Sequence, residues 1–288
     1  MLKRNIGILL IIIAILVMLY PFISRHELST MNKELSHNYY KTDISEEEKK
    51  VKDEAKEEYN TSLLYGAFNA EGEIESLQLP KAKLLSKELE PIGVLYIPRI
   101  DEDIPVYLGT TDDVLTIGVG VVENTSIPGG MGTNSVISGH RGTHNGNFFL
   151  HLDDMVEGDD IFYVSNGEIL KYTVYGTDIV QPDEASKLEV DPLRDKMTLL
   201  TCTPYLINTE RLLVYAERST VTEEDNELFA EKFSNEKQDD IDIQALEKSA
   251  KIKIIFQLSA SFIILVTAFI IIPTLVNKNK KEKEESLK

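Results

Sequence analysis

The chemistry of this chain centres on a single thiol. Cys202 is the only cysteine, and it ends an apolar, β-prone run that begins at Thr198. A second such run opens at Arg211 after a short loop. If the two runs pair as a hairpin, Cys202 and Arg211 face each other near one rim of a sheet, with Cβ atoms about 5 Å apart. A guanidinium there could stabilise a thiolate or an oxyanion. The alternative is a structural arginine whose stem covers the rim.

A histidine between glycines is the second candidate. His140 lies in the sequence Ser-Gly-His-Arg-Gly at 138–142, directly after a predicted strand that ends at Ser138. Glycines on either side leave the imidazole accessible and let other backbone approach closely. Cysteine nucleophiles usually need such a partner, because a free thiol is mostly protonated near neutral pH. An ordinary loop histidine fits the same residues, and the sequence alone does not bring His140 to Cys202.

Metal binding is a weaker interpretation of the histidines. His140 and His144 are spaced i,i+4, and His151 follows further along. Gly142 and the pair Asn145-Gly146 interrupt any helix that would align them, and no second cysteine is available as a ligand. We therefore predict no metal site and no cofactor.

The candidate residues lie in a strand-rich region, residues 91–218. Short apolar runs rich in Val, Ile and Tyr alternate there with turn residues, and Asn166-Gly167 joins two runs as a hairpin turn would. Many short strands with few helices predict a mainly β domain, either a barrel or a sandwich. The runs are Gly93–Ile97, Ile104–Tyr107, Asn134–Ser138, Ile161–Val164, Ile169–Tyr175, Met197–Cys202 and Arg211–Ala216.

Two polar segments flank this core. In residues 24–90, Ser45 and Glu48 fit a capping box, and acid–base pairs four residues apart follow it. We expect a solvated helix there, with a second short helix near residues 81–89. Residues 219–253 have the composition of a linker. The first helix offers the core only a thin apolar stripe, made of Val51, Ala55 and Tyr59.

Two uncharged apolar runs, residues 6–23 and 254–276, stand outside these segments. At about 1.5 Å per residue, each could cross a bilayer core of roughly 30 Å. The first could instead be a signal peptide, but its length and the lack of a small-x-small cleavage site favour an uncleaved anchor. Basic residues in both tails, 1–5 and 277–288, predict that both ends are cytoplasmic. The predicted protein is thus a two-pass cell-membrane protein with an extracytoplasmic core.

The net charge limits the choice of partners. The formal net charge is −18, and most acidic residues lie between the two predicted spans. A field of this sign repels nucleic acid and anionic lipid, and it suits cationic partners or serves solubility alone.

Several motifs together resemble the sortase family. Thr198-Leu199-Leu200-Thr201-Cys202 matches the family's TLxTC signature, and Arg211 follows at the spacing of its active-site arginine. Residues 138–142 match the (T/S)GHR motif, and Phe148-Phe149 after them is similar to members of classes B and C.

Further segments resemble class C, the pilus-assembly type. They are Gly93–Ile100, Cys202–Tyr205 and Asn208–Val214. A second, C-terminal span is also typical of that class. The similarity covers about Ile92 to Arg218.

The resemblance implies an eight-stranded barrel with short helices. It implies that Cys202 is the nucleophile, that His140 is the general acid/base, and that Arg211 holds the substrate or the oxyanion, with Thr201 and Thr203 contacting the substrate. The expected reaction cleaves the Thr–Gly bond of an LPxTG-like sorting signal on a pilin or surface protein. An amine then resolves the acyl-enzyme, typically a pilin lysine, at a Gram-positive cell surface.

One feature departs from the class C pattern. Such enzymes commonly carry a lid with an Asp-Pro-aromatic motif before the barrel, and the stretch between Asn60 and Pro91 contains none. The only Asp-Pro, Asp191-Pro192, precedes a leucine late in the core. Either a lid is absent or it uses other residues, such as Tyr65–Phe68.

Two rival functions remain open at the level of sequence. A housekeeping sortase would anchor proteins to cell-wall peptide with the same residues. A two-span sensor or scaffold would instead bury Cys202 as a small apolar side chain. Labelling of the thiol distinguishes the scaffold from the enzyme.

Overall fold

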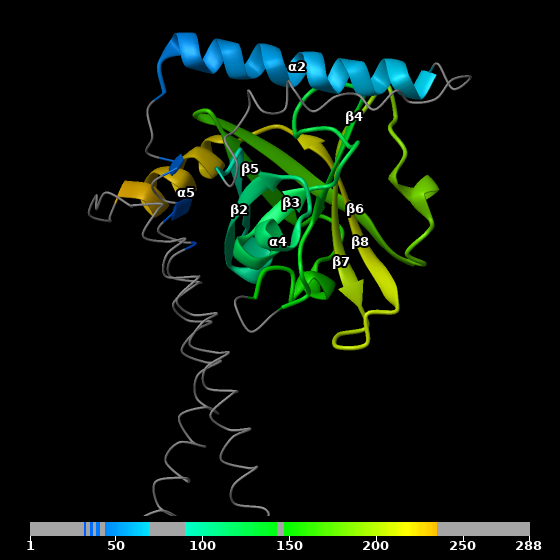
Figure 1. Cartoon of the computed structure of the whole chain (residues 1–288). Helices are drawn as coiled ribbons and strands as arrows, with labels where there is room; N and C mark the ends of the chain where they lie inside the picture. Colours follow the sequence, from blue (N-terminus) through cyan, green and yellow to red (C-terminus); the bar gives the residue numbers. More distant parts are fainter. Residues whose placement is uncertain are drawn as a thin grey trace, which may run out of the picture. The chain divides into compact units, whose positions relative to one another are not determined.

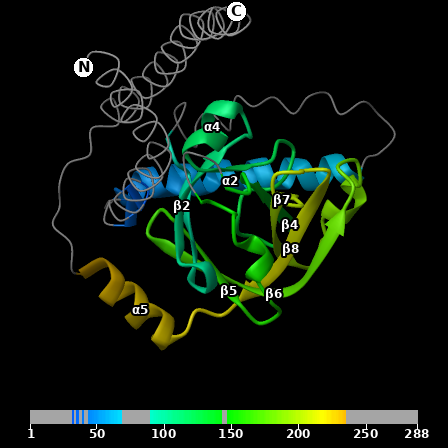
Figure 2. The same ribbon diagram turned by 90° about the horizontal axis from the view of Figure 1, so that it is seen from below.

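The computed structural model describes residues 44–68, 90–142 and 147–234, together with a few single positions before residue 41. Within these ranges, eight strands close into a barrel in the order β1-β2-β3-β4-β7-β8-β6-β5 (Figures 1 and 2). The pairs β2–β3 and β4–β7 are parallel, and the other pairs are antiparallel. The strands are β1 (Gly93–Ile97), β2 (Glu102–Leu108), β3 (Val119–Val121), β4 (Thr133–Ser138), β5 (Asp160–Ser165), β6 (Glu168–Val180), β7 (Asp195–Thr203) and β8 (Glu210–Ser219).

Helices are few and short beside this barrel, so the predicted mainly β class and the barrel are confirmed. The α-helices in the described ranges are α2 (Glu46–Phe68), α4 (Asp112–Ile117) and α5 (Glu223–Ser234). Single 3-10 turns are η1 (Pro98–Ile100), η2 (Leu152–Asp154) and η3 (Ala185–Leu188).

The barrel encloses an apolar core to which the strands contribute in turn. Leu95, Ile104, Ile137, Leu199 and Val214 come from five different strands, and each is at most 1% exposed. Side chains this well buried have little freedom to move, which fixes the strand ends that carry the candidate residues.

All of the predicted strand runs fall within observed strands, and the predicted hairpin is present. Asn166 and Gly167 both have positive φ, 51° and 75°, between the paired ends of β5 and β6, as a type I′ turn requires. β6 extends beyond the predicted run because it bulges between Val174 and Gly176 and then pairs on with β8. The short strand β3 was not predicted, because three residues are too few to show a period.

The predicted N-terminal helix is present as α2. The backbone N–H of Glu48 donates to Ser45 Oγ at 3.2 Å, which confirms the cap, and Lys52 pairs with Glu48 at 3.1 Å. Docking relies on a residue that the apolar stripe did not include. Buried Asn60 donates to the carbonyl of Ile127 and accepts from the N–H of the same residue, both at 2.9 Å.

α2 lies across only one end of the barrel, and Cys202 lies toward the opposite end. α2 crosses the end where β7 begins, whereas Cys202 lies near the end of β7 (Figure 1). Gly129, which accepts a hydrogen bond from Asn60, adjoins Gly130, whose N–H donates to Asp195 at the start of β7.

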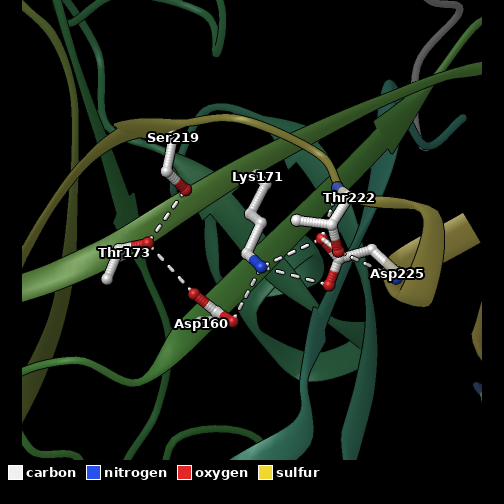
Figure 3. A network of polar contacts seen from close by, with 6 residues as sticks. All are labelled: Asp160, Lys171, Thr173, Ser219, Thr222 and Asp225. Carbon is white, nitrogen blue, oxygen red and sulfur yellow. Dashed lines mark hydrogen bonds and ion pairs between the residues drawn. The ribbon is translucent and has the colours of Figure 1, made fainter.

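Part of the predicted linker 219–253 is a docked helix. Lys171 of β6 bonds Asp225 in the first turn of α5 at 2.9 Å and Asp160 of β5 at 3.0 Å (Figure 3). Asp225 also accepts from the backbone and hydroxyl of Thr222, which caps the helix. The many polar residues of this segment obscured an apolar anchor, Phe229, which is 5% exposed.

An aromatic cluster completes the docking of α5. The ring of Phe229 packs edge-on against Tyr96 and Phe162, with centroids 5.9 and 5.1 Å away. Lys232 lies over the ring of Tyr96 and pairs with Asp103 at 2.8 Å. The chain after β8 is therefore held against β1, β2 and β5.

Several sequence predictions concern residues that the structure does not describe. No helix in the described ranges has the length and apolarity needed to cross a membrane, and both predicted spans, 6–23 and 254–276, lie outside those ranges. The same holds for the second short helix near 81–89 and for His144. Of the alternative lid residues, Tyr65–Phe68 form the last turn of α2.

Candidate active site

Cys202 lies in the penultimate position of β7, a strand with a neighbour on each side. β8 pairs antiparallel to it and β4 parallel to it. The side chain is partly exposed, and its thiol is free. A nucleophile in this position is fixed by the sheet yet reachable from the end of the barrel.

Arg211 lies directly opposite Cys202, as the sequence predicted. The register pairs Cys202 with Arg211 one step before the strands diverge into their loop. Arg211 Nη1 donates to the backbone carbonyls of Asn208 at 3.2 Å and Glu210 at 2.9 Å. Both bonds use Nη1, whereas the guanidinium carries further N–H donors. The loop therefore orients the group through one of its three nitrogens.

The β7–β8 loop presents apolar side chains beside this pair. Leu206 and Ile207 are 78% and 67% exposed, and Tyr205 is 40% exposed. The N–H groups of Ile207 and Asn208 both donate to the carbonyl of Pro204, at 3.0 and 2.9 Å. A loop closed by its own backbone can thus hold apolar side chains in solvent beside the thiol.

His140 reaches the level of Cys202 through the other neighbour, β4. The parallel register pairs Ser138 with Leu200, so that residues 140 and 202 each lie two positions further along. The N–H of Gly139 donates to the carbonyl of Leu200 at 3.1 Å, which continues the alignment past the end of β4. Adjacent strands lie about 4.8 Å apart, and the register thus brings His140 and Arg211 toward Cys202 from the two neighbours of β7.

The glycines around His140 serve close packing. A Cβ on Gly139 would lie 2.6 Å from Val119 and 2.8 Å from Phe149. Gly142 has φ +69°, and a Cβ there would lie 2.9 Å from Leu150. The close neighbours at both glycines are side chains, so the predicted approach of backbone to the imidazole stays a prediction, and His140 itself is half-buried.

Burial is the main influence on the titration of His140. Desolvation lowers the pKa of His140 below its usual value, and the carboxylate of Asp112 opposes this by favouring the charged form. Asp112 lies in the first turn of α4, which Thr111 caps and which leads into β3, the neighbour of β4. A neutral imidazole is able to accept the proton of a thiol, as a general base must.

The two threonines beside Cys202 are engaged within the protein. Thr201 is fully buried, and its hydroxyl donates to the carbonyl of Gly139 at 2.8 Å. The hydroxyl of Thr203 accepts from Arg141 Nη1 at 2.6 Å. Substrate contact by Thr201 and Thr203 stays a prediction.

Sequence reasoning missed two residues near the site, Arg141 and Asp112. Arg141 lies in the motif that identified His140, and this position in the motif is the signal that could have found it. The contribution of Asp112 comes from the fold, because it is far from His140 in sequence. Among the described residues, no group of three or more His, Cys, Asp or Glu side chains could hold a metal.

Two comparisons with known sequences agree with this arrangement. The sortase domain family matches residues 95–219. Sortase D of Bacillus subtilis is 31% identical over 144 residues, which is 49% of this chain and 70% of that protein. Sortase A of Streptococcus agalactiae is 26% identical over 153 residues, 52% of this chain, and the chain spans only 62% of that protein's length.

Solved structures give a similar result. Sortase C1 of GBS Pilus Island 1 superimposes with a TM-score of 0.61 at 34% identity, covering 68% of this chain and all of that chain. A Clostridium perfringens sortase C, solved with the C-terminal cell wall sorting motif, gives a TM-score of 0.56 at 38% identity. That match covers 62% of this chain and 92% of the other.

Proposed function

Because this chain belongs to the sortase family, we propose that it is a cysteine transpeptidase that cleaves LPxTG-like sorting signals at the Thr–Gly bond. One observation carries the proposal. Cys202, the only thiol in the chain, lies opposite Arg211 of β8, and His140 follows the end of β4, the strand on the other side of β7. Such a grouping supplies a nucleophile, a proton carrier and a cation within reach of one carbonyl group.

The acylation step follows from these positions. His140 takes the proton of the Cys202 thiol, and Sγ attacks the threonine carbonyl carbon of the sorting signal. Arg211 stabilises the negative charge that develops on the carbonyl oxygen. The C–N bond then breaks, and the imidazolium returns its proton to the departing glycine amine. The product is a thioester on Cys202.

The second step reverses the roles. An incoming amine attacks the thioester carbonyl, and neutral His140 accepts a proton from the attacking nitrogen. The C–S bond breaks, and the thiolate of Cys202 is restored beside Arg211. The lowered pKa of His140 favours the neutral imidazole near neutral pH, which is the form able to accept a proton in each step.

A pilin lysine is the proposed amine. The structural neighbours of class C support this, one of them from a pilus island and one solved with a sorting motif. The net charge of −18 would also attract a lysine-bearing partner. Thr201 and Thr203 remain proposed substrate contacts.

A housekeeping role is the second candidate. The relatives include two proteins named Sortase A, from Streptococcus agalactiae and Bacillus anthracis. In that role the acyl group would pass to a cell-wall peptide amine, with Cys202, His140 and Arg211 unchanged.

The proposed location is the outer face of a Gram-positive cell membrane. The apolar runs 6–23 and 254–276, and the basic residues beyond them, support a two-pass anchor with the barrel outside.

Mass spectrometry tests the proposed function directly. The full-length chain is incubated with an LPxTG-type peptide, and the intact mass is measured before and after addition of an amine. We expect an acyl adduct on Cys202 that either a lysine-containing pilin peptide or a cell-wall peptide removes, and the faster acceptor decides between the two roles. Absence of an adduct with every peptide of this type would refute the transpeptidase.

A further inference from the structure

Arg141 connects the two strands that carry the proposed acid/base and nucleophile. Its Nη1 donates to the hydroxyl of Thr203 at 2.6 Å. Arg141 directly follows His140, and Thr203 directly follows Cys202. A single hydrogen bond therefore joins the neighbours of the two residues that must exchange a proton.

A second contact fixes the other side of the same guanidinium. Arg141 Nη2 pairs with Asp153 Oδ2 of η2 at 2.5 Å. The two contacts use both terminal nitrogens of a planar fork, a geometry that a lysine does not reproduce.

Burial of Arg141 argues for a role inside the protein. Its side chain is 10% exposed, whereas that of Asp153 is 52% exposed. Nε of Arg141 is buried with no hydrogen-bond partner in the described part of the chain. Keeping a guanidinium there is costly, and a cation so enclosed is poorly placed to bind substrate, unlike the more accessible Arg211.

The surrounding backbone shows why such a link is needed. The carbonyl of His140 accepts from the N–H groups of Gly142 at 2.9 Å and Phe149 at 3.2 Å. These two bonds join His140 to residues that follow it in the chain. The backbone bond to β7 comes one residue earlier, from the N–H of Gly139 to Leu200. The paired register of β4 and β7 ends at Leu200, before Cys202.

We propose that Arg141 is a positioning residue that holds His140 level with Cys202 through its bond to Thr203. The proposal rests on the transpeptidase function stated above and adds to it a residue that acts through another. Thr201 supports the same alignment from one position earlier, through its bond to Gly139.

Three variants separate positioning from folding. T203V removes the acceptor and keeps the shape of the side chain, R141K keeps the charge and loses the fork, and R141A removes both. For R141A we expect kcat/KM to fall on the order of 10²-fold, the cost of a displacement of about 1 Å near a reacting group. R141K should recover only part of this loss. Because T203V leaves Arg141 paired with Asp153, its melting temperature should stay near that of the wild type.

Arg99→Ala provides a matched control. Arg99 donates to the carbonyl of Asp154 in the same turn η2 at 3.3 Å and pairs with Asp159. The substitution therefore removes an arginine that contacts η2 and leaves the link to Thr203 in place. We expect wild-type transfer rates for this variant.

Alkylation of the single thiol gives a readout that does not depend on the substrate. The rate of iodoacetamide reaction with Cys202 in the full-length chain is followed against pH. An imidazole beside the thiol should shape this profile, so H140A should differ from the wild type. Asp112, the other charged group that acts on His140, is unchanged in all variants.

Each outcome decides the matter. Profiles of R141A and T203V that move toward that of H140A support the proposal, with R99A on the wild-type curve. A wild-type profile in both R141A and T203V would overturn it, as would coincidence of the wild-type and H140A curves. Failure of the transpeptidase function would show separately, as a lack of any acyl adduct in the wild type.

Discussion

Cys202 and Arg211 are opposed residues of one antiparallel pair, β7 with β8. Their separation is therefore set by sheet geometry and does not depend on the conformation of the long side chain alone. Cys202 has His140 on its other side, at the level that the parallel pairing with β4 defines. In the proposed mechanism, the thiol receives a base from one neighbour and a cation from the other.

The first prediction concerns the nucleophile. C202A should abolish acyl transfer, because the chain has no second thiol to take over the reaction. The side chain is small and partly exposed, so the melting temperature should change little. C202S serves as the control for side-chain shape. Transfer of an LPxTG-type peptide by C202A would contradict the mechanism.

The second prediction concerns Arg211. We expect R211A to reduce kcat by roughly 10²–10³-fold, the usual cost of removing one oxyanion donor. R211K should recover part of the rate, since it keeps the charge and loses the fork. A purely structural arginine would instead lower the melting temperature and leave the turnover of folded protein intact.

Arg194→Ala is the control for that experiment. Arg194 is a partly exposed arginine that pairs with Glu217 and lies over the ring of Tyr175. None of these residues adjoins Cys202 in the sheet. Its variant should transfer at the wild-type rate, and turnover near wild type in R211A would remove Arg211 from the mechanism.

The third prediction concerns the pH profile. Burial lowers the pKa of His140, and Asp112 raises it in opposition. In D112N the opposing influence is lost, so the pKa of His140 should fall further. The acidic limb of kcat/KM, where His140 must be neutral, should then move to lower pH. D113N is the matched control from the same helical turn, and an unmoved limb in D112N would contradict the assignment.

The fourth prediction concerns the docking of α5. Asp225 is 8% exposed and pairs with Lys171 at 2.9 Å. D225N keeps the helix cap to Thr222 but loses the charge, and we expect a loss of roughly 2 kcal/mol in the free energy of unfolding. D178N, in the exposed pair Asp178–Lys187, should change little.

The pH dependence of this loss has a definite sign. Burial raises the pKa of Asp225, but hydrogen bonds from Thr222 and Lys171 outweigh it and leave the pKa lowered. Stability from such a group is present above the unfolded carboxylate pKa, about 4, and is lost as pH falls through the folded pKa. The difference in melting temperature between wild type and D225N should therefore shrink on acidification. A constant difference would exclude the ionised pair as its cause.

The fifth prediction concerns topology. A protease added to intact protoplasts should digest the barrel and spare both tails, residues 1–5 and 277–288. Antibodies against a tag on each tail read the result. Digestion of the C-terminal tail would refute the two-pass arrangement.

Local signals in the sequence predicted seven of the eight strands and the pairing of Cys202 with Arg211. Cys202 and Arg211 could be paired in advance because β7 and β8 are consecutive, and a hairpin brings its ends together. The approach of His140 could not be derived, because β4 and β7 pair in parallel across a long stretch of chain. The resemblance supplied that proximity as an expectation, and the register places both residues two positions beyond the Ser138–Leu200 pair.

Other misses share a physical origin. β3 is too short to show a period, and Phe229 lies in a helix made mostly of polar residues, so neither produced a clear pattern. Lys171, Asp160 and Asp225 each look like surface charges when read alone. They form a partly buried ion-pair network only once the fold has brought them together.

The closed barrel has a consequence for recognition. The closed strand order leaves little room for strand addition, because β7 pairs with β8 to its end and only Thr201–Thr203 extend beyond the pairing with β4. We expect discrimination among the proposed sorting signals to rely mainly on side chains and loops at the rim, such as the exposed Leu206 and Ile207. Loops tolerate change far better than strands. Specificity could therefore diverge between relatives while the arrangement around Cys202 stays fixed.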